Sequence, residues 1–323
     1  MGAGEENPII LKKIKFMHKV KKYLSLVKFS HTIFAMPFAF IGFFLGVMHR
    51  KTSNMFQEVG NNKTIIQHSY FSNQYVLENF LLVIICMVTA RNAAMAFNRY
   101  LDRHFDARNP RTAIREIPKG IISPESALRF VLLNCLLFMG TTYFINKICF
   151  YLAPVALFVV LFYSYTKRFT ALCHLVLGLG LSLAPIGAYL AVTGTFNLLP
   201  VLFSFAVIFW VSGFDVIYAL QYIEFDQSQD LYSIPAVFGK AAALRISSFL
   251  HFLSAACVIL AGYYGHFHWL YWIGILLFTG MLLYQHSIVK PNDLSRVNIA
   301  FMTANGIASV VFSVFVIADL FIF

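Results

Sequence analysis

The sequence predicts an all-α, polytopic membrane bundle of about nine transmembrane helices. Of its 323 residues, 59% are hydrophobic and 12% are charged, with a mean hydropathy of +0.72. Soluble domains are about a quarter charged, because polar side chains must cover their core. Apolar runs long enough to cross a bilayer recur along this chain, and Lys and Arg gather on alternate connections between them. These observations indicate that lipid surrounds most of the protein.

The first element is a basic arm, residues 1–29. Its lysines precede the first long apolar run, where they attract anionic headgroups and orient the chain, so the net charge of +11 requires no nucleic-acid partner. The apolar residues between Ile9 and Leu26 permit an interfacial helix, and a flexible positive anchor is an equal alternative. The following run is too long for a cleaved signal peptide. The lysines are Lys12, Lys13, Lys15, Lys19, Lys21, Lys22 and Lys28.

Residues 30–323 form a single transmembrane domain, because no Pro-, Gly- or Ser-rich linker or charge block divides them. A helix needs about 20 apolar residues to cross the hydrocarbon layer. The fourth predicted span is short, and the seventh and eighth nearly touch. Five scattered cysteines without a CxxC pair argue against disulfides and zinc sites. The spans lie near 30–48, 77–98, 125–145, 148–164, 171–192, 198–219, 241–263, 267–288 and 297–322.

The basic residues predict the orientation of these spans. With a cytosolic N-terminus, nineteen Lys and Arg fall in the arm and in the loops after spans two, four, six and eight, and four fall outside. Cytosolic loops carry such an excess in membrane proteins. We therefore expect a multi-pass protein of a bacterial inner (plasma) membrane, with the N-terminus and these loops cytosolic. The outer basic residues are Arg50, Lys51, Lys63 and Lys147.

Two of the cytosolic loops collect an unusual share of the 14 acidic residues. One cluster follows the second span and the other ends or follows the sixth, and both spans run outside to inside, so both clusters emerge on the same face. Asn98, Asp102 and Asp106 recur every four residues, which stacks three oxygen-bearing side chains on one helix face. The second cluster is Asp215, Glu224, Asp226 and Asp230, and a similar stripe joins Asp215, Tyr218, Tyr222 and Asp226.

Carboxylates and amides without thiols suit a hard cation such as Mg²⁺, which completes its shell with water and substrate phosphate. Basic side chains in the same loops suit the oxygens of a diphosphate, and an apolar bundle beneath them suits a hydrocarbon tail. Solvated helix caps and salt bridges are the alternative, but Asp215 continues an apolar run at membrane depth, where an unpaired carboxylate is costly. The basic residues are Arg103, Arg111, Arg115, Lys119, Lys167 and Arg168.

At these residues the chain resembles the UbiA superfamily of intramembrane prenyltransferases. Asn98-x3-Asp102-x3-Asp106 is similar to its first aspartate motif, and the stretch from Gly213 to Gln221 to the start of its second. The motifs span roughly residues 28–245 in the family's order. Further matches are Asn109-Pro-Arg111-Thr and Ile117-Pro-Lys-Gly120, Tyr165-Thr-Lys167-Arg168-Phe-Thr170, and Ser233-Ile-Pro235.

This resemblance implies nine helices around a central cavity, two Mg²⁺ ions, and prenyl transfer through an allylic carbocation. Lys28-Phe-Ser-His31-Thr and Ala35-Met-Pro-Phe-Ala39 look like the 4-hydroxybenzoate polyprenyltransferase-like branch, which serves ubiquinone or menaquinone assembly. The substrates it implies are a polyprenyl diphosphate and a small aromatic acceptor that is a carboxylic acid. Water must be kept from the carbocation, and residues 107–124 are the expected lid.

The motif positions imply roles for individual residues. Tyr218 is placed to bind a phosphate oxygen or to stabilise the cation with its ring, although an interfacial tyrosine is equally common, and the positive-inside rule by itself explains cytosolic Lys and Arg. The expected metal ligands are Asp102, Asp106, Asp215 and Asp226, with Asn98 as ligand or support. The expected catalytic residues are Asp102, Asp106, Asp215 and Tyr218, and the expected substrate-binding residues are Asn98, Lys28, Arg111, Lys167 and Arg168.

Three further residues, Tyr222, Arg91 and Lys28, depart from the motif or lie in unusual surroundings. Tyr222 stands where the family's second motif usually ends in Asp, and we expect the site to work because the other motif positions are retained. Arg91 lies within an apolar run, where an unpaired guanidinium is costly, so a salt bridge is expected, with the acceptor carboxylate as the alternative partner. Lys28, beside His31, is either a contact for the acceptor carboxylate or an interfacial anchor.

Three other functions are compatible with a polytopic bundle. An enzyme of the same class could use haem, a chlorophyll precursor or a lipid glycerol backbone as the acceptor, which a panel of acceptors would distinguish. A transporter predicts acidic residues near the bilayer midplane and discontinuous helices in repeated halves. Here the acidic residues cluster at one face. A scaffold protein predicts no dependence on Mg²⁺.

Overall fold

The computed structural model describes residues 22–27, 36–60 and 73–323, and only the backbone of residues 52–60. Lys28, His31 and almost all of the basic arm lie outside these residues. The described part is all-α, apart from one isolated bridge between Lys290 and Asp293. Its helices are α2 (Met36–Gly60), α3 (Asn73–Leu101), α4 (Arg103–Arg108), α5 (Pro124–Ile145), α6 (Lys147–Thr166), α7 (Cys173–Thr193), α8 (Leu198–Ala219), α9 (Ile223–Ser228), α10 (Ile234–Tyr264), α11 (Trp269–Ile288) and α12 (Asn305–Ile322).

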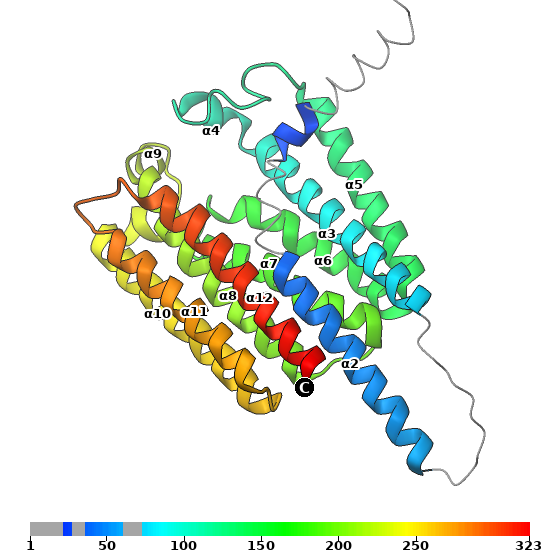
Figure 1. Ribbon diagram of the computed structural model, residues 1–323. Helices are drawn as coiled ribbons and strands as arrows, with labels where there is room; N and C mark the ends of the chain where they lie inside the picture. Colours follow the sequence, from blue (N-terminus) through cyan, green and yellow to red (C-terminus); the bar gives the residue numbers. More distant parts are fainter. Residues whose placement is uncertain (1–21, 28–35, 61–72) are drawn as a thin grey trace, which may run out of the picture.

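The long helices correspond one to one to the predicted spans. By length and composition, seven of the described helices can cross a membrane: α3, α5, α6, α7, α8 with its continuation to Ser228, α10, and α12 with the π-helical turn Ile299–Ala304 before it. The remaining two, α2 and α11, have 25 and 20 residues and pack in the same bundle, α2 against α7 and α12, and α11 against α12 and α10. Figure 1 shows α4 and α9 at one end of the bundle and the C-terminus at the other.

Two predicted boundaries differ from the helix ends by several residues: the first span was expected to end near 48, whereas α2 continues to Gly60, and the start of the seventh span also differs. The seventh span begins at Ile234 rather than 241, because Ser233 caps α10 by accepting a hydrogen bond from the Ala236 N–H at 3.3 Å, and a proline lies in the first turn. Gly239, at φ 77°, then interrupts the helix, and its left-handed backbone is one that glycine adopts without strain. The apolar run marks the membrane-spanning part, whereas the cap marks the start of the helix.

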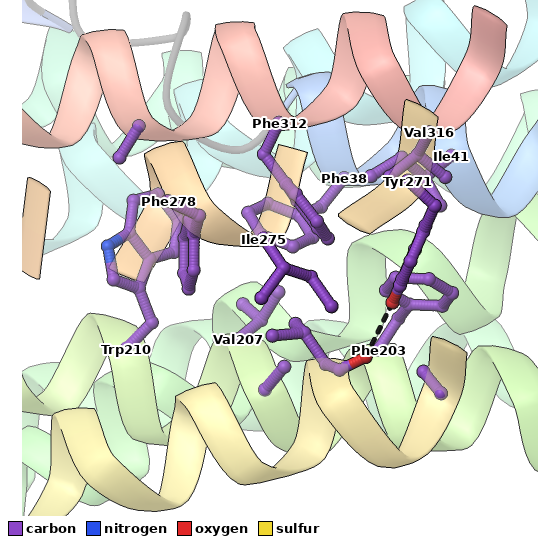
Figure 2. Packing of buried hydrophobic residues seen from close by; sticks show 14 of the residues in the cluster. Phe38, Ile41, Phe203, Val207, Trp210, Tyr271, Ile275, Phe278, Phe312 and Val316 are labelled. Carbon is purple, nitrogen blue, oxygen red and sulfur yellow. Dashed lines mark hydrogen bonds between the residues drawn. The ribbon is translucent and has the colours of Figure 1, made fainter. Parts of the chain in front are cut away.

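Aromatic side chains fill one half of the bundle. Figure 2 shows the cluster between α2, α8, α11 and α12, in which the Phe38 and Trp210 rings lie 5.2 Å apart, and the Phe278 and Phe312 rings also lie 5.2 Å apart. The Tyr271 hydroxyl donates a 2.6 Å hydrogen bond to the Val258 carbonyl, which joins α10 to the cluster. Such packing holds α8 against three neighbouring helices. The other half, around α3, α5, α6 and α7, encloses open volume.

Close contact between α7 and α8 joins these two halves. A Cβ on Gly178 would lie 2.5 Å from the Ile208 carbonyl oxygen, so only glycine allows this approach. One turn earlier in α7, the His174 carbonyl accepts a hydrogen bond of 3.0 Å from the Ser212 hydroxyl of α8. The first turn of α7 is therefore fixed beside the last turns of α8.

Asn305, at the junction of the π-helical turn and α12, offers a test of this packing. It is fully buried, and its Oδ1 accepts hydrogen bonds from Trp210 Nε1 and Gln285 Nε2, both at 2.9 Å. We expect Asn305→Leu to lower the free energy of unfolding by about 2–6 kcal/mol, because each of the two donors left buried costs about 1–3 kcal/mol. Thermal unfolding in detergent measures the loss, and an unchanged midpoint would show that the donors find other partners.

Candidate active site

A cavity of about 730 Å³ lies among α3, α5, α6, α7 and α8. Its deeper walls are apolar side chains of these helices, such as Val83, Leu157 and Leu181. Both acidic clusters reach its polar end. The predicted site residues that line it are Asn98, Asp102, Asp106, Lys167, Asp215, Tyr218 and Asp226.

The first cluster sits where α3 passes into α4. Backbone hydrogen bonds from Asp102 N to the Asn98 carbonyl at 2.9 Å, and from Asp106 N to the Asp102 carbonyl at 2.8 Å, carry the helical path through the junction, so the three side chains share one face as expected. Asn98 Nδ2 lies 3.3 Å from Asp102 Oδ2. The amide therefore supports the Asp102 carboxylate directly.

Two basic residues of the α6–α7 loop engage Asp102, which is only 2% exposed. Lys167 Nζ lies 2.6 Å from Oδ2, and Arg168 Nη2 donates to Oδ1 at 3.1 Å and to the Leu101 carbonyl at 3.2 Å. Burial raises the pKa of the Asp102 carboxyl, while Lys167 and Arg168 act to lower it. A bound cation would act in the same direction as these two side chains.

The loop after α4 is bonded to Asp106 of the first acidic cluster and to the 3₁₀ turn between α8 and α9. Arg115 Nη1 contacts both carboxylate oxygens of Asp106, at 2.8 and 2.9 Å, and the Thr112 hydroxyl donates to the Asp106 carbonyl at 3.0 Å. On the other side, Arg111 Nη2 donates to Gln221 Oε1 at 2.6 Å. Arg99, under the loop, pairs with Glu116. The expected lid is therefore packed over the polar end of the cavity.

The second cluster is not one continuous helical stripe, contrary to the expectation. Helix α8 ends at Ala219, and a 3₁₀ turn, Leu220–Tyr222, separates it from α9. Asp215 Oδ2 lies 2.7 Å from His174 Nδ1, and Asp226 Oδ2 accepts a hydrogen bond of 2.9 Å from the Ser233 hydroxyl. Asp215 thus reaches the cavity from the last turns of α8 and Asp226 from the short helix α9, and each carboxylate is held by a side chain from another part of the chain.

Tyr222 takes part in the site as an aromatic residue. Its hydroxyl lies 3.2 Å from that of Tyr218, and the Arg111 guanidinium sits 5.4 Å from its ring centroid. The Tyr218 ring stacks on Phe301 at 4.2 Å. The position that usually holds a carboxylate therefore supports Arg111 and Tyr218 here.

Arg91 lines the middle of the cavity, about two helical turns from Asn98. The expected salt bridge is wrong for the described part of the chain, where no carboxylate pairs with Arg91, and its buried Nε has no hydrogen-bond partner. A guanidinium at this depth without a carboxylate partner is costly, so a ligand with negative charge would be a natural partner. The alternative expectation, an acceptor carboxylate as the partner of Arg91, stays a prediction.

Two of the residues expected to bind substrate lie beside the cavity and do not line it. Two other residues belong to the site although the sequence did not point to them. Arg111 and Arg168 do not line the cavity but contact residues that do, Tyr222 and Asp102 respectively. His174 and Ser233 hold the second cluster, and neither was singled out for a role in the site. A lone histidine at the start of a span carries no spacing signal, since its partner lies 41 residues away.

The side chains at the polar end fit a hard divalent cation that a ligand helps to hold. Among the described residues, no three Asp, Glu, His or Cys side chains gather closely enough to bind a metal by themselves. Mg²⁺ commonly uses one or two carboxylates, and water and substrate phosphate supply the remaining oxygens. The cavity lining provides these groups: two pairs of carboxylates for the cation, and Lys167 and Arg115 for the phosphate oxygens of a ligand.

Comparison with solved structures shows the same fold. The chain superposes on a UbiA homologue from Aeropyrum pernix K1 with a TM-score of 0.74 and 27% identity, covering 90% of this chain and 98% of that one. It also superposes on a UbiA homologue from Archaeoglobus fulgidus, solved with DMAPP and Mg²⁺, with a TM-score of 0.66 and 19% identity over 94% of this chain and all of that one.

Sequence comparison gives the family. A 4-hydroxybenzoate octaprenyltransferase of Actinobacillus pleuropneumoniae is 31% identical over 216 residues, which are 67% of this chain and 72% of that protein. The enzyme of the same name from Tolumonas auensis is 28% identical over 223 residues, 69% of this chain and 78% of that protein. The profile of the UbiA prenyltransferase family matches residues 69–307, which contain both acidic clusters and the cavity between them. The chain therefore belongs to the UbiA prenyltransferase family and is a membrane-embedded prenyltransferase.

Proposed function

We propose that this enzyme transfers a polyprenyl group from a polyprenyl diphosphate to the ring of a small aromatic carboxylic acid such as 4-hydroxybenzoate, in an Mg²⁺-dependent step of ubiquinone or menaquinone synthesis. One observation carries the proposal: carboxylates of both clusters, the unpaired Arg91 and an apolar wall belong to one cavity. The relatives named 4-hydroxybenzoate octaprenyltransferase support this choice of acceptor.

The diphosphate is assigned to the polar end. Asp102 and Asp106 from one side, and Asp215 and Asp226 from the other, would hold two Mg²⁺ ions, with Asn98 supporting Asp102. When bound, Mg²⁺ supplies positive charge that stabilises the departing diphosphate. Lys167, Arg168 and Arg111 are the basic residues that would bind its oxygens, with the Tyr218 hydroxyl beside them. Binding the substrate would require Lys167 and Arg168 to share Asp102 with the metal.

The acceptor is assigned to the middle of the cavity. The Arg91 guanidinium would bind its carboxylate, which would hold the ring between the diphosphate end and the apolar wall that receives the prenyl tail. Ionisation of the allylic C–O bond gives a carbocation that the ring attacks, and the ring then loses a proton. The loop packed over the polar end by Arg115 and Arg111 would keep water from the cation.

The placement in the cell is also part of the proposal. Residues 1–29 would form a basic cytosolic arm and residues 30–323 one transmembrane domain in a bacterial inner membrane. Both acidic clusters would face the cytosol, where the water-soluble acceptor is available. The excess of Lys and Arg on that side supports this orientation.

Incubating membranes that contain the protein with prenyl diphosphates of different lengths and a panel of acceptors tests the function. We expect a prenylated 4-hydroxybenzoate or a close aromatic acid, formed only with a divalent cation. Transfer to haem or to a lipid glycerol backbone alone would show that the acceptor is of another class. No transfer to any acceptor would contradict the proposal.

Tyr222→Asp separates a working site from a degenerate one. Because Tyr222 supports Arg111 and Tyr218 while Asp215 and Asp226 supply the carboxylates, we expect the parent to turn over with Mg²⁺ and the variant to gain little. The measurement is turnover against Mg²⁺ concentration for both proteins. An inactive parent rescued by Asp would show that this chain lacks a required ligand.

A further inference from the structure

His174 is a buried side chain that contacts two parts of the second acidic cluster, and the function proposed above gives it no role. It lies in the first turn of α7 and is 3% exposed. Its Nδ1 lies 2.7 Å from Asp215 Oδ2, and its Nε2 lies 3.3 Å from the backbone nitrogen of Ile234. The imidazole therefore bridges α8 and the start of α10.

These two contacts define the tautomer. A backbone N–H can only donate, so His174 Nε2 accepts from Ile234, and the ring proton must be on Nδ1, from which it is donated to Asp215. This donation fixes one oxygen of the carboxylate and leaves the other for a cation. Outer hydrogen bonds of this kind orient the ligands of metal sites.

The turn that His174 contacts also holds the other carboxylate. The hydroxyl of Ser233, the residue next to Ile234, donates to Asp226 Oδ2 at 2.9 Å. One residue earlier, the Tyr232 N–H donates to the Lys167 carbonyl at 2.7 Å. Residues 232–234 are thus bonded to the chain at Lys167, to Asp226 and, through the imidazole, to Asp215.

No continuous helix fixes the position of Asp215 relative to Asp226, so contacts from other segments must do so. Helix α8 ends at Ala219, so a 3₁₀ turn and not a rigid helix separates Asp215 from Asp226, and Tyr222 between them supplies no carboxylate. The approach of α7 to α8 at Gly178 brings His174 within reach of Asp215. A buried imidazole and a helix cap therefore replace helical continuity between the two carboxylates.

We propose that His174 and Ser233 are positioning residues that hold Asp215 and Asp226 at the separation required by a metal-bound diphosphate. This inference rests on the function proposed above. It assigns no contact between His174 and the substrate, since the side chain acts through Asp215 and the 232–234 turn.

The test measures the affinity of the full-length, detergent-solubilised protein for Mn²⁺ in the presence of inorganic pyrophosphate. Electron paramagnetic resonance detects the Mn²⁺. We expect His174→Ala to weaken Mn²⁺ binding about 10- to 100-fold, the usual effect of losing such a partner. His174→Asn places an amide donor near Nδ1 and should recover much of the affinity. Ser233→Ala should weaken binding in the same direction, and Ser233→Thr, which keeps the hydroxyl, should not.

His251→Ala is the matched control. His251 is also a buried histidine, 3% exposed, and it packs against α8 at Gly213, two residues from Asp215, without bonding to a carboxylate in the described part of the chain. We expect the His251→Ala variant to bind Mn²⁺ with the affinity of the parent, even if the variant unfolds at a lower temperature.

The outcomes separate the inference from the function on which it rests. Parent-like Mn²⁺ affinity in His174→Ala, or equal losses in His174→Ala, His174→Asn and His251→Ala, would refute the positioning role and leave the proposed function standing. A parent that binds no Mn²⁺ with pyrophosphate would refute the metal-dependent function and this inference together.

Discussion

Replacing Asp102 or Asp215 by Asn will remove most of the prenyl transfer, with kcat/KM falling about 10²- to 10³-fold for each, the size of effect that loss of one electrostatic group has at a transition state. Each substitution keeps the shape of the side chain and removes the charge. Asp102 is held by Lys167 and Arg168, and Asp215 by His174, so the amides should remain near the same positions. The measurement is transfer from a prenyl diphosphate at several Mg²⁺ concentrations.

Glu224→Gln is the control for this prediction. Glu224 belongs to the same acidic cluster but is exposed and does not line the cavity, so its loss should leave kcat/KM unchanged. Both active-site variants should elute from size exclusion as the parent does. Parent-like transfer by Asp102→Asn or Asp215→Asn would contradict the assignment, as would an equal loss in Glu224→Gln.

The second large effect concerns the acceptor. Arg91→Met should raise the KM for 4-hydroxybenzoate about 10- to 100-fold, because a hydrogen bond to a charged group contributes about 1.5–3 kcal/mol and about 1.4 kcal/mol corresponds to a factor of ten. Methionine keeps an unbranched side chain without the charge and suits the apolar wall around Arg91. The KM for the prenyl diphosphate should change little. Steady-state kinetics with each substrate varied in turn measures both constants.

An acceptor without a carboxylate provides the control. With 4-hydroxybenzyl alcohol, the parent should already show a high KM, and Arg91→Met should add almost nothing to it. Equal losses with the acid and the alcohol would indicate that Arg91 supports the structure of the cavity and does not bind the carboxylate. No loss with either would place the acceptor elsewhere.

Much of the fold follows from features that the bilayer imposes on any sequence. Apolar runs identify the spans because the hydrocarbon layer sets their length, and the orientation of spans two and six places Asp102 and Asp215 at the same end. Both residues line one cavity, as the sequence argument required. Asn98, Asp102 and Asp106 also share one face as their spacing predicted, because the helical path continues from α3 into α4.

What the sequence did not reveal depends on contacts between distant segments. The bond between His174 and Asp215 joins two helices that approach closely only because Gly178 lacks a side chain. The 3₁₀ turn after Ala219 contains no proline or glycine from which the end of the helix could be predicted. The free-energy cost of an unpaired guanidinium in an apolar run predicts a partner for Arg91. It does not show whether that partner is a carboxylate of the protein, as was expected, or a group of a ligand.

In the proposed mechanism, both acidic clusters hold one metal-bound diphosphate within one cavity. The most direct measurement is a structure of the protein with Mn²⁺ and an unreactive prenyl thiolodiphosphate, with the metal located by its anomalous scattering. We expect metal peaks between Asp102 or Asp106 and Asp215 or Asp226, with the diphosphate beside Lys167 and the tail along the apolar wall. A diphosphate bound outside this cavity, or metal contacted by only one of the two clusters, would contradict it.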